Sequence, residues 1–401
     1  MIVAKNGDAF RILNTDCPRA ARGFGRRTIR QQPKIAGRSA SLQEALSRAA
    51  QILRDASRPL IAGLGTDLAG CRAAVALAEK CGAVVDHMHG ESLIRNFRVL
   101  QSRGGFFTTL AELKNRADVI LFVGTDVQSS HPRFFERFVR PLPSMRYRHI
   151  TSRTIMYLGS IRRSRTGIPR GGEKPLHLMC SDAEVGALIA VLRGLLDGHE
   201  PARHAMLGRG RVRKLKLIGQ RLQAAHYAVI VWATAEFRAP HPDLIVNDIC
   251  EIILKLNRTT RAGGLPMGGN DGATSWTNVC TWQSGFPSRI SFASGAPEYD
   301  PHLHAARNML GSGGADALLW ISCFDPDRVP SAPSVPTILL GQANASAIRD
   351  AEVFLPAGVP GIDHRGNQSR MDGVVGLPLR QLRDPGGNAA YELLDRIRER
   401  L

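Results

Sequence analysis

Apolar residues recur along this chain either at the spacing of an α-helix or in short runs typical of buried β-strands. Helical and strand patterns alternate, and this alternation predicts an α/β protein. Residues 42–53 place apolar side chains on one face at helical spacing, and Ser41 with Glu44 has the pattern of a capping box at the start. Residues 59–86 then read as strand, helix and strand. Two buried strands joined by a helix form a βαβ unit, so we expect a parallel sheet.

The same alternation recurs further along the chain, where a predicted helix at 110–115 leads into a strand at 119–124. Four more short apolar runs read as strands, at 228–233, 317–322, 337–340 and 353–355. The first forty residues have little periodicity after two short strand-like pieces, and we expect an irregular arm there. The fold class predicted from these patterns is doubly wound α/β.

Length and composition limit the class of protein. A chain of 401 residues that is 43% hydrophobic forms two or three domains. No apolar run approaches the roughly 18 residues of a membrane span, and the amino terminus lacks a secretory signal, so we expect a soluble, cytoplasmic protein. The seven cysteines are scattered and include no C-x-x-C pair, which argues against a disulfide framework and against zinc or iron–sulfur loops.

The positive charge is concentrated in two segments. The net charge is +18 and the pI is about 10.4. Residues 1–40 hold nine Lys and Arg against two acidic residues, and residues 133–174 hold eleven against two. Such clustering predicts a polyanionic partner, either nucleic acid, an acidic protein or a polycarboxylate ligand.

The glycines after the first predicted strand do not form a nucleotide-binding motif. Gly63 and Gly65 are followed by a third glycine, Gly70, that comes too late for the dinucleotide fingerprint. Cys71 and Arg72 replace the Lys and Ser or Thr of a phosphate loop. We interpret the glycines as tight turns between strand and helix.

His87 and His89 have metal-ligand spacing at the end of a predicted strand, because alternate residues of a strand point to the same side. An amidohydrolase centre needs further histidines, a lysine and an aspartate at other strand ends of an eight-fold barrel. The chain has no such series. Histidines at a strand end more often form local hydrogen bonds, and this alternative is the simpler one.

Several segments resemble the B subunit of formylmethanofuran dehydrogenase, a member of the molybdopterin oxidoreductase superfamily. These segments occur in the same order as in the family and extend over nearly the whole chain. They are 117–124 leading to 131–133, the glycine-rich run 263–272 followed by 278–287, 315–317 leading to 322–326, and 363–373. The last of these is similar to the family's acidic-glycine segment beside the pterin pyrophosphate. The resemblance implies two discontinuous Rossmann-like domains, at 41–86 with 262–401 and at 87–261, after a basic arm at 1–40 that is the remnant of an iron–sulfur domain.

The chain departs from this family at its redox ligands. Active members carry a C-x-x-C-x-x-x-C loop and a fourth cysteine, whereas only Cys17 remains here, at the fourth position. One thiolate cannot hold a cluster that needs four. The family also binds molybdenum or tungsten through Cys or selenocysteine followed by His. Counting from Asp86 places Ser92 and Leu93 at these two positions. A serine hydroxyl is a poor ligand for such a metal, and a leucine side chain cannot transfer protons.

The resemblance therefore implies a non-catalytic B subunit without molybdopterin or an iron–sulfur cluster. It would serve a bacterial formyltransferase/hydrolase complex that converts formyl-tetrahydromethanopterin to formate through a methanofuran-type carrier. The expected partners are an amidohydrolase-like A subunit, a C subunit and a formyltransferase D subunit. Arginines that would contact these partners, or the glutamyl tail of the carrier, are Arg22, Arg26, Arg27, Arg30, Arg146, Arg148, Arg153, Arg162, Arg163, Arg165 and Arg170.

Three other functions are left open by the sequence. One is an active molybdenum or tungsten dehydrogenase that uses Ser92 as an unusual ligand. Another is an amidohydrolase with a metal at His87 and His89. The third is a nucleic-acid binder, which the charge favours. Aromatic residues are only 6% of the chain, however, and no known nucleic-acid-binding motif is recognisable.

Overall fold

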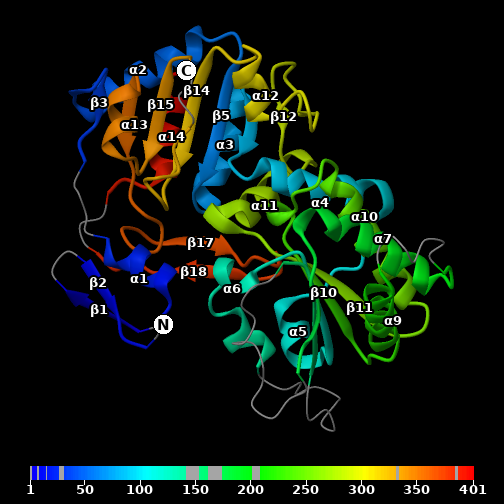
Figure 1. Cartoon of the computed structure of the whole chain (residues 1–401). Coiled ribbons are helices and arrows are strands. Elements are labelled where there is room, and N and C mark those ends of the chain that lie inside the picture. The colour runs from blue at the N-terminus through cyan, green and yellow to red at the C-terminus, as the bar shows by residue number, and fades with distance from the viewer. Residues whose placement is uncertain are drawn as a thin grey trace. The chain divides into compact units, whose positions relative to one another are not determined.

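The chain folds into two units (Figure 1). In this computed structural model, unit 1 comprises Met1–Glu91 with Gly268–Leu401, and unit 2 comprises Ser92–Met267. The division falls a few residues beyond the boundaries expected at 86/87 and 261/262, and the first forty residues are part of unit 1 rather than a separate domain. The structure describes residues 2–6, 9–14, 16–26, 31–140, 153–160, 174–200, 208–330, 334–383 and 387–401.

Unit 1 is built on a nine-stranded sheet with the order β13-β12-β6-β5-β14-β15-β16-β3-β4. Its five central strands are parallel, and each was predicted from an apolar run. Short antiparallel strands extend both sides. The strands are β3 (Lys34–Ile35), β4 (Arg38–Ser39), β5 (Pro59–Gly65), β6 (Val84–His87), β12 (Ile290–Ser291), β13 (Glu298–Tyr299), β14 (Ala317–Ser322), β15 (Thr337–Gly341) and β16 (Val353–Pro356).

The helices of unit 1 begin where the sequence provides caps. Ser41 and Glu44 form the predicted capping box of α2, and the Asp67 carboxylate accepts the Gly70 N–H at the start of α3. Apolar residues of α2, α3, α11 and α14 pack with strands β5, β14 and β15 in one core. The helices are α1 (Pro18–Gly25), α2 (Leu42–Asp55), α3 (Leu68–Cys81), α11 (Ala273–Ser284), α12 (Ala306–Gly311), α13 (Ala345–Asp350) and α14 (Ala390–Arg398), with a 3₁₀ turn at Asn270–Gly272.

Two expectations for unit 1 need correction. The two strand-like pieces at the amino terminus form a hairpin of β1 (Val3–Asn6) and β2 (Ala9–Ile12), but the arm that follows them is not irregular throughout, because it contains α1. Gly63 does not lie in a strand-to-helix turn. It lies inside β5 with φ of +79°, next to an irregularity in the pairing of β5 with β14, and a Cβ there would meet the Ile321 carbonyl oxygen at 2.6 Å.

A second hairpin in unit 1 was not expected from the sequence. Strands β17 (Gly366–Ser369) and β18 (Gly376–Leu379) are antiparallel. Their sequences, GNQS and GLPL, contain glycine and proline and lack the alternation that identifies a strand. The hairpin follows the segment that resembles the family's pterin-associated motif.

Unit 2 has a five-stranded parallel sheet with the order β11-β10-β7-β8-β9. The sequence predicted β7 (Val119–Val123) and β10 (Ala228–Trp232) but not β8 (Thr154–Leu158), β9 (Leu176–Leu178) or β11 (Ala262–Pro266). The helices of this unit are α4 (Gly90–Arg103, which starts at the end of unit 1), α5 (Leu110–Arg116), α6 (Val127–Ser130), α7 (Val185–Leu196), α9 (Arg209–Gln223) and α10 (Pro242–Leu256), with a π-helical turn at Phe135–Val139 and 3₁₀ turns at Asp182–Glu184 and Thr234–Glu236.

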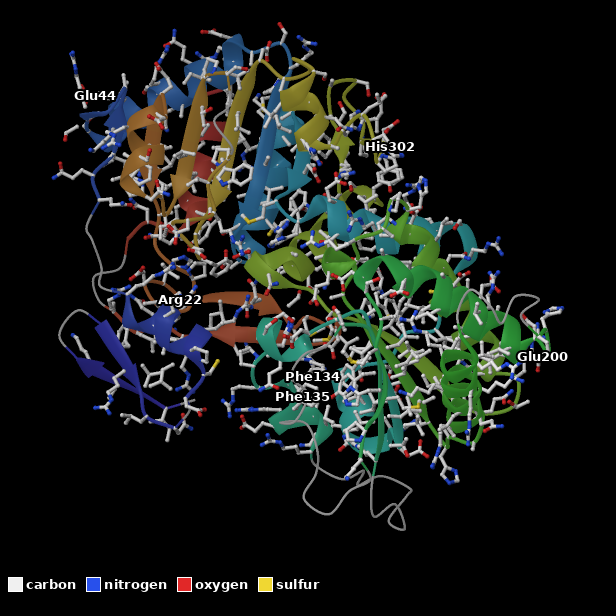
Figure 2. The ribbon with its side chains drawn as sticks, viewed as in Figure 1. Arg22, Glu44, Phe134, Phe135, Glu200 and His302 are labelled. Carbon is white, nitrogen blue, oxygen red and sulfur yellow. The ribbon has the colours of Figure 1, made fainter. Side chains whose placement is uncertain are left out.

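Aromatic side chains fill one end of unit 2. The Phe122 and Tyr157 rings stack with centroids 5.0 Å apart, and Phe134 and Phe135 approach the Phe122 ring from the π-helical segment (Figure 2). These contacts join β7, β8 and the turn in one apolar layer.

Within the described residues, no helix is both long enough and apolar enough to cross a membrane.

Candidate functional site

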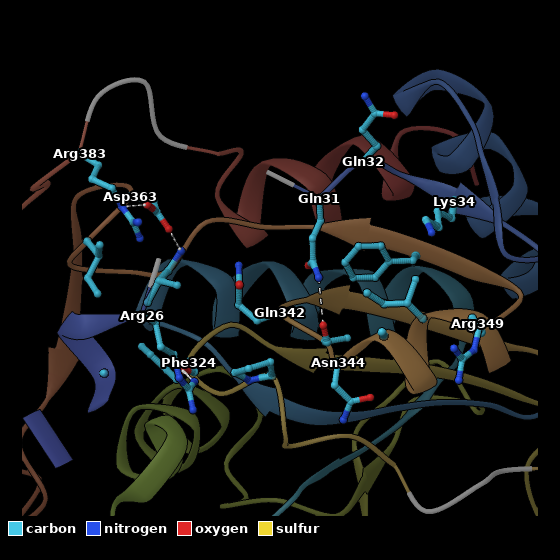
Figure 3. A pocket seen from close by; sticks show the side chains of 18 of the residues that line it. Arg26, Gln31, Gln32, Lys34, Phe324, Gln342, Asn344, Arg349, Asp363 and Arg383 are labelled. Atoms are coloured by element: carbon cyan, nitrogen blue, oxygen red, sulfur yellow. Dashed lines mark hydrogen bonds and ion pairs between the residues drawn. The ribbon is translucent and has the colours of Figure 1, made fainter. Parts of the chain in front are cut away.

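A cavity of about 1020 Å³ lies in unit 1 where strands β14, β15 and β16 end (Figure 3). Phe324 and Pro326 follow β14, Gln342 to Ala345 follow β15, and Val359 to Asp363 follow β16. In open parallel sheets, ligands bind outside the carboxyl ends of the strands. The cavity is therefore the candidate binding site that the topology of unit 1 provides.

The amino-terminal arm forms one wall of this cavity. Arg26 makes an ion pair with Asp325 at 2.9 Å and reaches the Phe324 carbonyl oxygen at 3.5 Å. The Gln31 amide donates to the Ala343 carbonyl oxygen at 3.1 Å. These contacts occupy polar groups at the ends of β14 and β15, so Arg26 helps to hold the arm against unit 1, and its role as a partner contact stays a prediction.

Asp363, the acidic residue of the segment that resembles the pterin motif, is also engaged within the chain. Its carboxylate pairs with the Arg383 Nε at 2.8 Å and accepts the Val359 N–H at 2.8 Å. The side chain is almost fully buried. Its charge is thus compensated before any ligand binds.

Two cations of the cavity are not engaged in this way. The side chains of Lys34 and Arg349 have no ion-pair or hydrogen-bond partner in the described part of the chain, and both residues line the cavity. The Gln31 Oε1 is buried and lacks a donor there. Figure 3 shows Lys34 and Arg349 at one end of the cavity and Arg26, Asp363 and Arg383 at the other.

The arrangement suits the binding of an anion. After the two ion pairs cancel, Lys34 and Arg349 leave the cavity positive, while Phe324, Ile348 and Phe354 give it apolar walls. An anion with a flat apolar part matches both features.

His87 and His89 are held by the loop before α11. The Asp271 carboxylate contacts the His89 Nε2 at 2.7 Å, the Asp271 carbonyl oxygen lies 3.3 Å from the His87 Nε2, and the His87 Nδ1 accepts the His89 N–H. Burial, together with the nearby His89, lowers the pKa of His87 to about 3. Both histidines thus have hydrogen-bond partners within unit 1, although Asp271 is distant in sequence.

No metal centre is formed around these histidines. Within the described ranges, no group of three or more His, Cys, Asp or Glu side chains is placed to hold a metal ion. Their hydrogen bonds instead fix Asp271, whose φ of +51° is unusual for a residue other than glycine. The structure does not support the amidohydrolase alternative.

The position expected for the lost metal ligand lies in a helix. Strand β6 ends at His87 and α4 begins at Gly90, so Ser92 and Leu93 are in the first turn of α4. The Ser92 carbonyl oxygen accepts the Thr234 hydroxyl at 2.7 Å within unit 2. The residues that directly follow the strand are Met88 and His89, both half-buried.

The cysteines are free thiols that the structure buries in large part. Cys17 precedes α1, Cys71, Cys280 and Cys323 lie in one apolar core of unit 1 with half-buried Cys81 packed against it, and Cys180 and Cys250 are in unit 2. Burial raises the pKa of Cys81, Cys180 and Cys250 to about 11 and that of Cys280 and Cys323 to about 12. These thiols are therefore packed as small apolar side chains.

Arg153 is not a surface residue, which corrects its assignment as a partner contact. It is 1% exposed, and its guanidinium donates to carbonyl oxygens at the end of α5 (Leu113, Lys114) and of the π-helical turn (Phe138, Val139). It therefore caps two helical segments inside unit 2.

Of the other predicted contact residues, Arg22 is exposed on α1 (Figure 2). The remaining ones lie outside the described residues: Arg27, Arg30, Arg146, Arg148, Arg162, Arg163, Arg165 and Arg170. Lys34 and Arg349 were not predicted as site residues. Lys34 was within the basic arm, but Arg349 is isolated in sequence, and only the ends of the strands bring the two to one cavity.

The fold and this cavity define the class of protein: a mixed α/β chain with parallel sheets and a positively charged cavity with apolar walls at the strand ends of unit 1. No family model matches the sequence. The chain is nevertheless similar over most of its length to the B subunits of formylmethanofuran dehydrogenases and of the formyltransferase/hydrolase complex Fhc, and the resemblance seen in the motifs is confirmed.

Two sequence relatives illustrate this similarity. The B subunit of the tungsten-containing formylmethanofuran dehydrogenase 2 of Methanocaldococcus jannaschii is 27% identical over 384 residues, which cover 89% of this chain and 82% of the relative. The B subunit of the formyltransferase/hydrolase complex Fhc of Methylorubrum extorquens is 28% identical over 380 residues, which cover 92% and 97%.

Solved structures agree. A chain in the crystal structure of the formyltransferase/hydrolase complex FhcABCD from Methylorubrum extorquens, in complex with methylofuran, matches with a TM-score of 0.79 and 26% identity, covering 92% of this chain and 98% of that chain. Acetylene hydratase from Pelobacter acetylenicus has a TM-score of 0.55 at 11% identity, covering 90% of this chain and 59% of that one, and this likeness concerns the fold alone.

Proposed function

We propose that this chain is the structural B subunit of a formyltransferase/hydrolase complex. The observation that carries the proposal is the match to the Methylorubrum extorquens protein, which extends over 92% of this chain and 97% of the relative. The complex would convert formyl-tetrahydromethanopterin to formate through a methanofuran-type carrier. Its other members would be the amidohydrolase-like A subunit, the C subunit and the formyltransferase D subunit, and it would act in the cytoplasm.

The chain would carry neither molybdopterin nor an iron–sulfur cluster. The relatives include tungsten-containing enzymes as well as the formyltransferase/hydrolase complex, so this part of the proposal depends on the ligands of this chain. Cys17 stands alone, without the C-x-x-C-x-x-x-C loop, and one thiolate cannot hold a cluster that needs four ligands. The two units would keep the domain plan of molybdopterin oxidoreductases as a scaffold.

The position of the lost metal ligand is better assigned to Met88 than to Ser92. The family pattern is a thiolate or selenolate followed by His shortly after the strand. In this chain the turn between β6 and α4 reads Met88 then His89, while Ser92 is already helical. A thioether is neutral and cannot replace the anionic ligand of a high-valent metal. The residual cavity at the strand ends would then be what remains of the pterin crevice.

Purification of the chain from its native host tests the proposal. We expect the A, C and D subunits to co-purify, identified by mass spectrometry, and less than stoichiometric Mo, W and Fe in the same sample. Stoichiometric metal with an absorption band near 400 nm would instead show an active dehydrogenase. A chain without these partners would contradict the scaffold role.

The basic segment at 133–174 gives a second test. Neutralising Arg162, Arg163 and Arg165 should weaken complex assembly or carrier turnover, increasingly as salt is raised, because screening weakens the remaining charge contacts. Replacement of Arg213, an exposed arginine of α9, provides the control. Unchanged assembly and turnover at every salt concentration would remove this role for the segment.

A further inference from the structure

The amino-terminal segment of unit 1, which consists of hairpin β1–β2 and helix α1, buries very little of its own surface (Figure 1). Among its residues whose burial the structure describes, only Phe10 and Cys17 are buried, and none of these lies in α1. A hairpin of two four-residue strands and an eight-residue helix are each marginal in water without a further surface to pack on. The stability of this segment therefore depends on what covers it.

One face of the hairpin is turned toward the rest of unit 1. Phe10 is 7% exposed, and the Arg383 guanidinium lies 5.7 Å from the centre of its ring. Helix α1 packs beside β2, and its Arg19 donates to the Asn270 side-chain oxygen at 3.2 Å. Successive residues of a strand point to opposite faces, so the neighbours of Phe10 point away from this contact.

The opposite face of the hairpin carries two exposed apolar side chains that are neighbours. Ile2 is 59% exposed and Leu13 is 58% exposed. The Leu13 N–H donates to the Ile2 carbonyl oxygen at 3.0 Å, which continues the register in which Val3 pairs with Ile12. Residues directly opposite each other on antiparallel strands have Cβ atoms about 5 Å apart. Ile2 and Leu13 thus form one apolar surface.

An arginine without a counter-charge lies on the same face. Ala4 pairs with Arg11, and these residues are two positions from Ile2 and Leu13 respectively, so all four share one face of the hairpin. The Arg11 side chain is exposed and has no ion-pair or hydrogen-bond partner in the part of the chain that the structure describes. The apolar surface is therefore bordered by one free positive charge.

Other charges of the segment have the same sign. Lys5 of β1 and Arg22 of α1 are exposed, and neither side chain has a partner among the described residues. The acidic side chains within the described part of the segment are limited to Asp16. Complementary charge across an interface favours the correct partner and accelerates association. The molecule that covers this segment should therefore present acidic groups.

A second copy of the chain does not meet this requirement. In a symmetric dimer the same patch of both copies would meet, which would place two positively charged segments against each other. Lys5 is also an exposed lysine on the edge strand β1, and lysines at such positions discourage the addition of a further strand. Recognition through the side chains of the outward face is left.

We propose that the face of hairpin β1–β2 formed by Ile2, Ala4, Arg11 and Leu13 docks a neighbouring protein of the complex that presents an apolar depression bordered by an acidic side chain. This inference rests on the proposed function, because it requires that the chain works in a complex. The depression would cover Ile2 and Leu13, and the acidic group would pair with Arg11. The partner would thereby supply the packing that the hairpin lacks within its own chain.

Hydrogen exchange of the intact complex, compared with the full chain alone, is the direct test. The backbone N–H groups of β1 and β2 should exchange roughly tenfold more slowly in the complex, because the partner covers a marginal hairpin. Those of β14 and β15, at the centre of the sheet, are the reference and should not change. An intact complex in which the hairpin exchanges as fast as in the chain alone would overturn this inference and leave the proposed function standing. A chain that forms no complex would overturn both.

Substitution of the apolar pair supplies an independent measurement. Ile2→Ser with Leu13→Ser should release one partner protein from the complex. The control is Leu303→Ser with Val374→Ser, at two other apolar side chains of unit 1, which are 71% and 60% exposed, and it should release none. Native mass spectrometry reads the composition, and circular dichroism verifies folding. Full retention of every partner by the first variant would contradict the proposal, as would equal release by the control.

A charge reversal tests the chemistry of the partner. Arg11→Glu should weaken the same contact roughly tenfold at low salt and less as salt is raised, because salt screens exposed charges. Arg72→Glu, on exposed Arg72 of α3, should leave the contact unchanged at every salt concentration. An unchanged contact in the Arg11 variant would exclude an acidic partner at this face. A dimer of the chain that the Ile2 and Leu13 substitutions dissociate would show a second copy there and would also overturn the proposal.

Discussion

Unit 1 contains two groups of charged side chains at its strand ends, and they differ in how their charges are compensated. In the first group, which we call the closed group, Arg289 pairs with Asp86 and Glu91 and donates to the Pro301 carbonyl oxygen. Its side chain is 4% exposed. In the second, the open group, Lys34 and Arg349 line a cavity and have no partner among the described residues.

The difference separates charges that maintain the fold from charges that are available to a ligand. A buried ion is costly unless other groups of the chain compensate it, so the closed group must be complete before anything binds. An exposed cation with no partner contributes little to stability. Function is therefore better sought at the open group, even though the buried Arg289 with its φ of +56° is the more unusual residue.

The largest effect should follow from breaking the closed group. Arg289→Met leaves the buried Asp86 without its cation, and removing one member of a buried ion pair costs about 3–5 kcal/mol. The control is Arg307→Met, on an exposed arginine of α12, which should change stability by less than about 0.5 kcal/mol. Urea unfolding measures both. Equal stability of the two variants would show that the buried pair is not needed.

An effect of intermediate size on stability is expected from a change in pH, because the buried Asp86 of the closed group and the neighbouring His87 both titrate. Burial lowers the pKa of His87 to about 3, so its contribution to stability is present above pH 6.5 and is lost as the pH falls toward 3. Burial raises the pKa of Asp86 to about 6 despite Arg289, so its contribution is present below pH 3.8 and is lost as the pH rises through 6. Between pH 6 and 4 the two residues oppose each other.

Single substitutions should separate these opposing contributions. His87→Asn retains Asp86 and should gain stability, relative to the wild type, as the pH falls from 6 to 4. Asp86→Asn retains His87 and should lose stability over the same range, each by at most about 1.4 kcal/mol per pH unit. Other titrating groups contribute equally to both variants. Parallel pH profiles of the urea midpoint would contradict the assignment.

The smallest change in stability is expected at the open group, with a clear change in binding. Lys34→Ala with Arg349→Ala should alter the free energy of unfolding by less than about 0.5 kcal/mol. The same variant should bind anilinonaphthalene sulfonate, a flat aromatic anion, roughly tenfold more weakly, equivalent to about 1.4 kcal/mol. Uncharged phenylnaphthylamine should bind both proteins equally. Loss of both probes would point to a damaged cavity instead of lost charge.

The sequence predicted the central strands of unit 1, β7 and β10 of unit 2, and helices α2, α3 and α5. Each has a strong local pattern, either a buried apolar run or a capped amphipathic face. Strands β11 and β18 were missed because AGGLP and GLPL contain residues that disfavour strands. Hydrogen bonding to a neighbouring strand overrides that preference. The neighbouring strand lies outside the short stretch of sequence from which a strand is predicted.

The site was predicted less completely for the same reason. Charge clustering indicated a surface role for Arg153, but its guanidinium caps helical segments in the interior. Arginine is compatible with either environment, and only the tertiary contacts distinguish them. The same limit applies to His87 and His89, whose partner Asp271 is more than 180 residues away in the chain.

The sequence by itself determined the α/β class, the elements with strong periodicity and the similarity to the B subunits of these complexes, because these depend on neighbouring residues and on motif order. The tertiary structure alone decided which charges are compensated and which face a cavity, because this depends on groups brought together from distant segments. Lys34 and Arg349 meet at one cavity only after β3, β15 and β16 have paired.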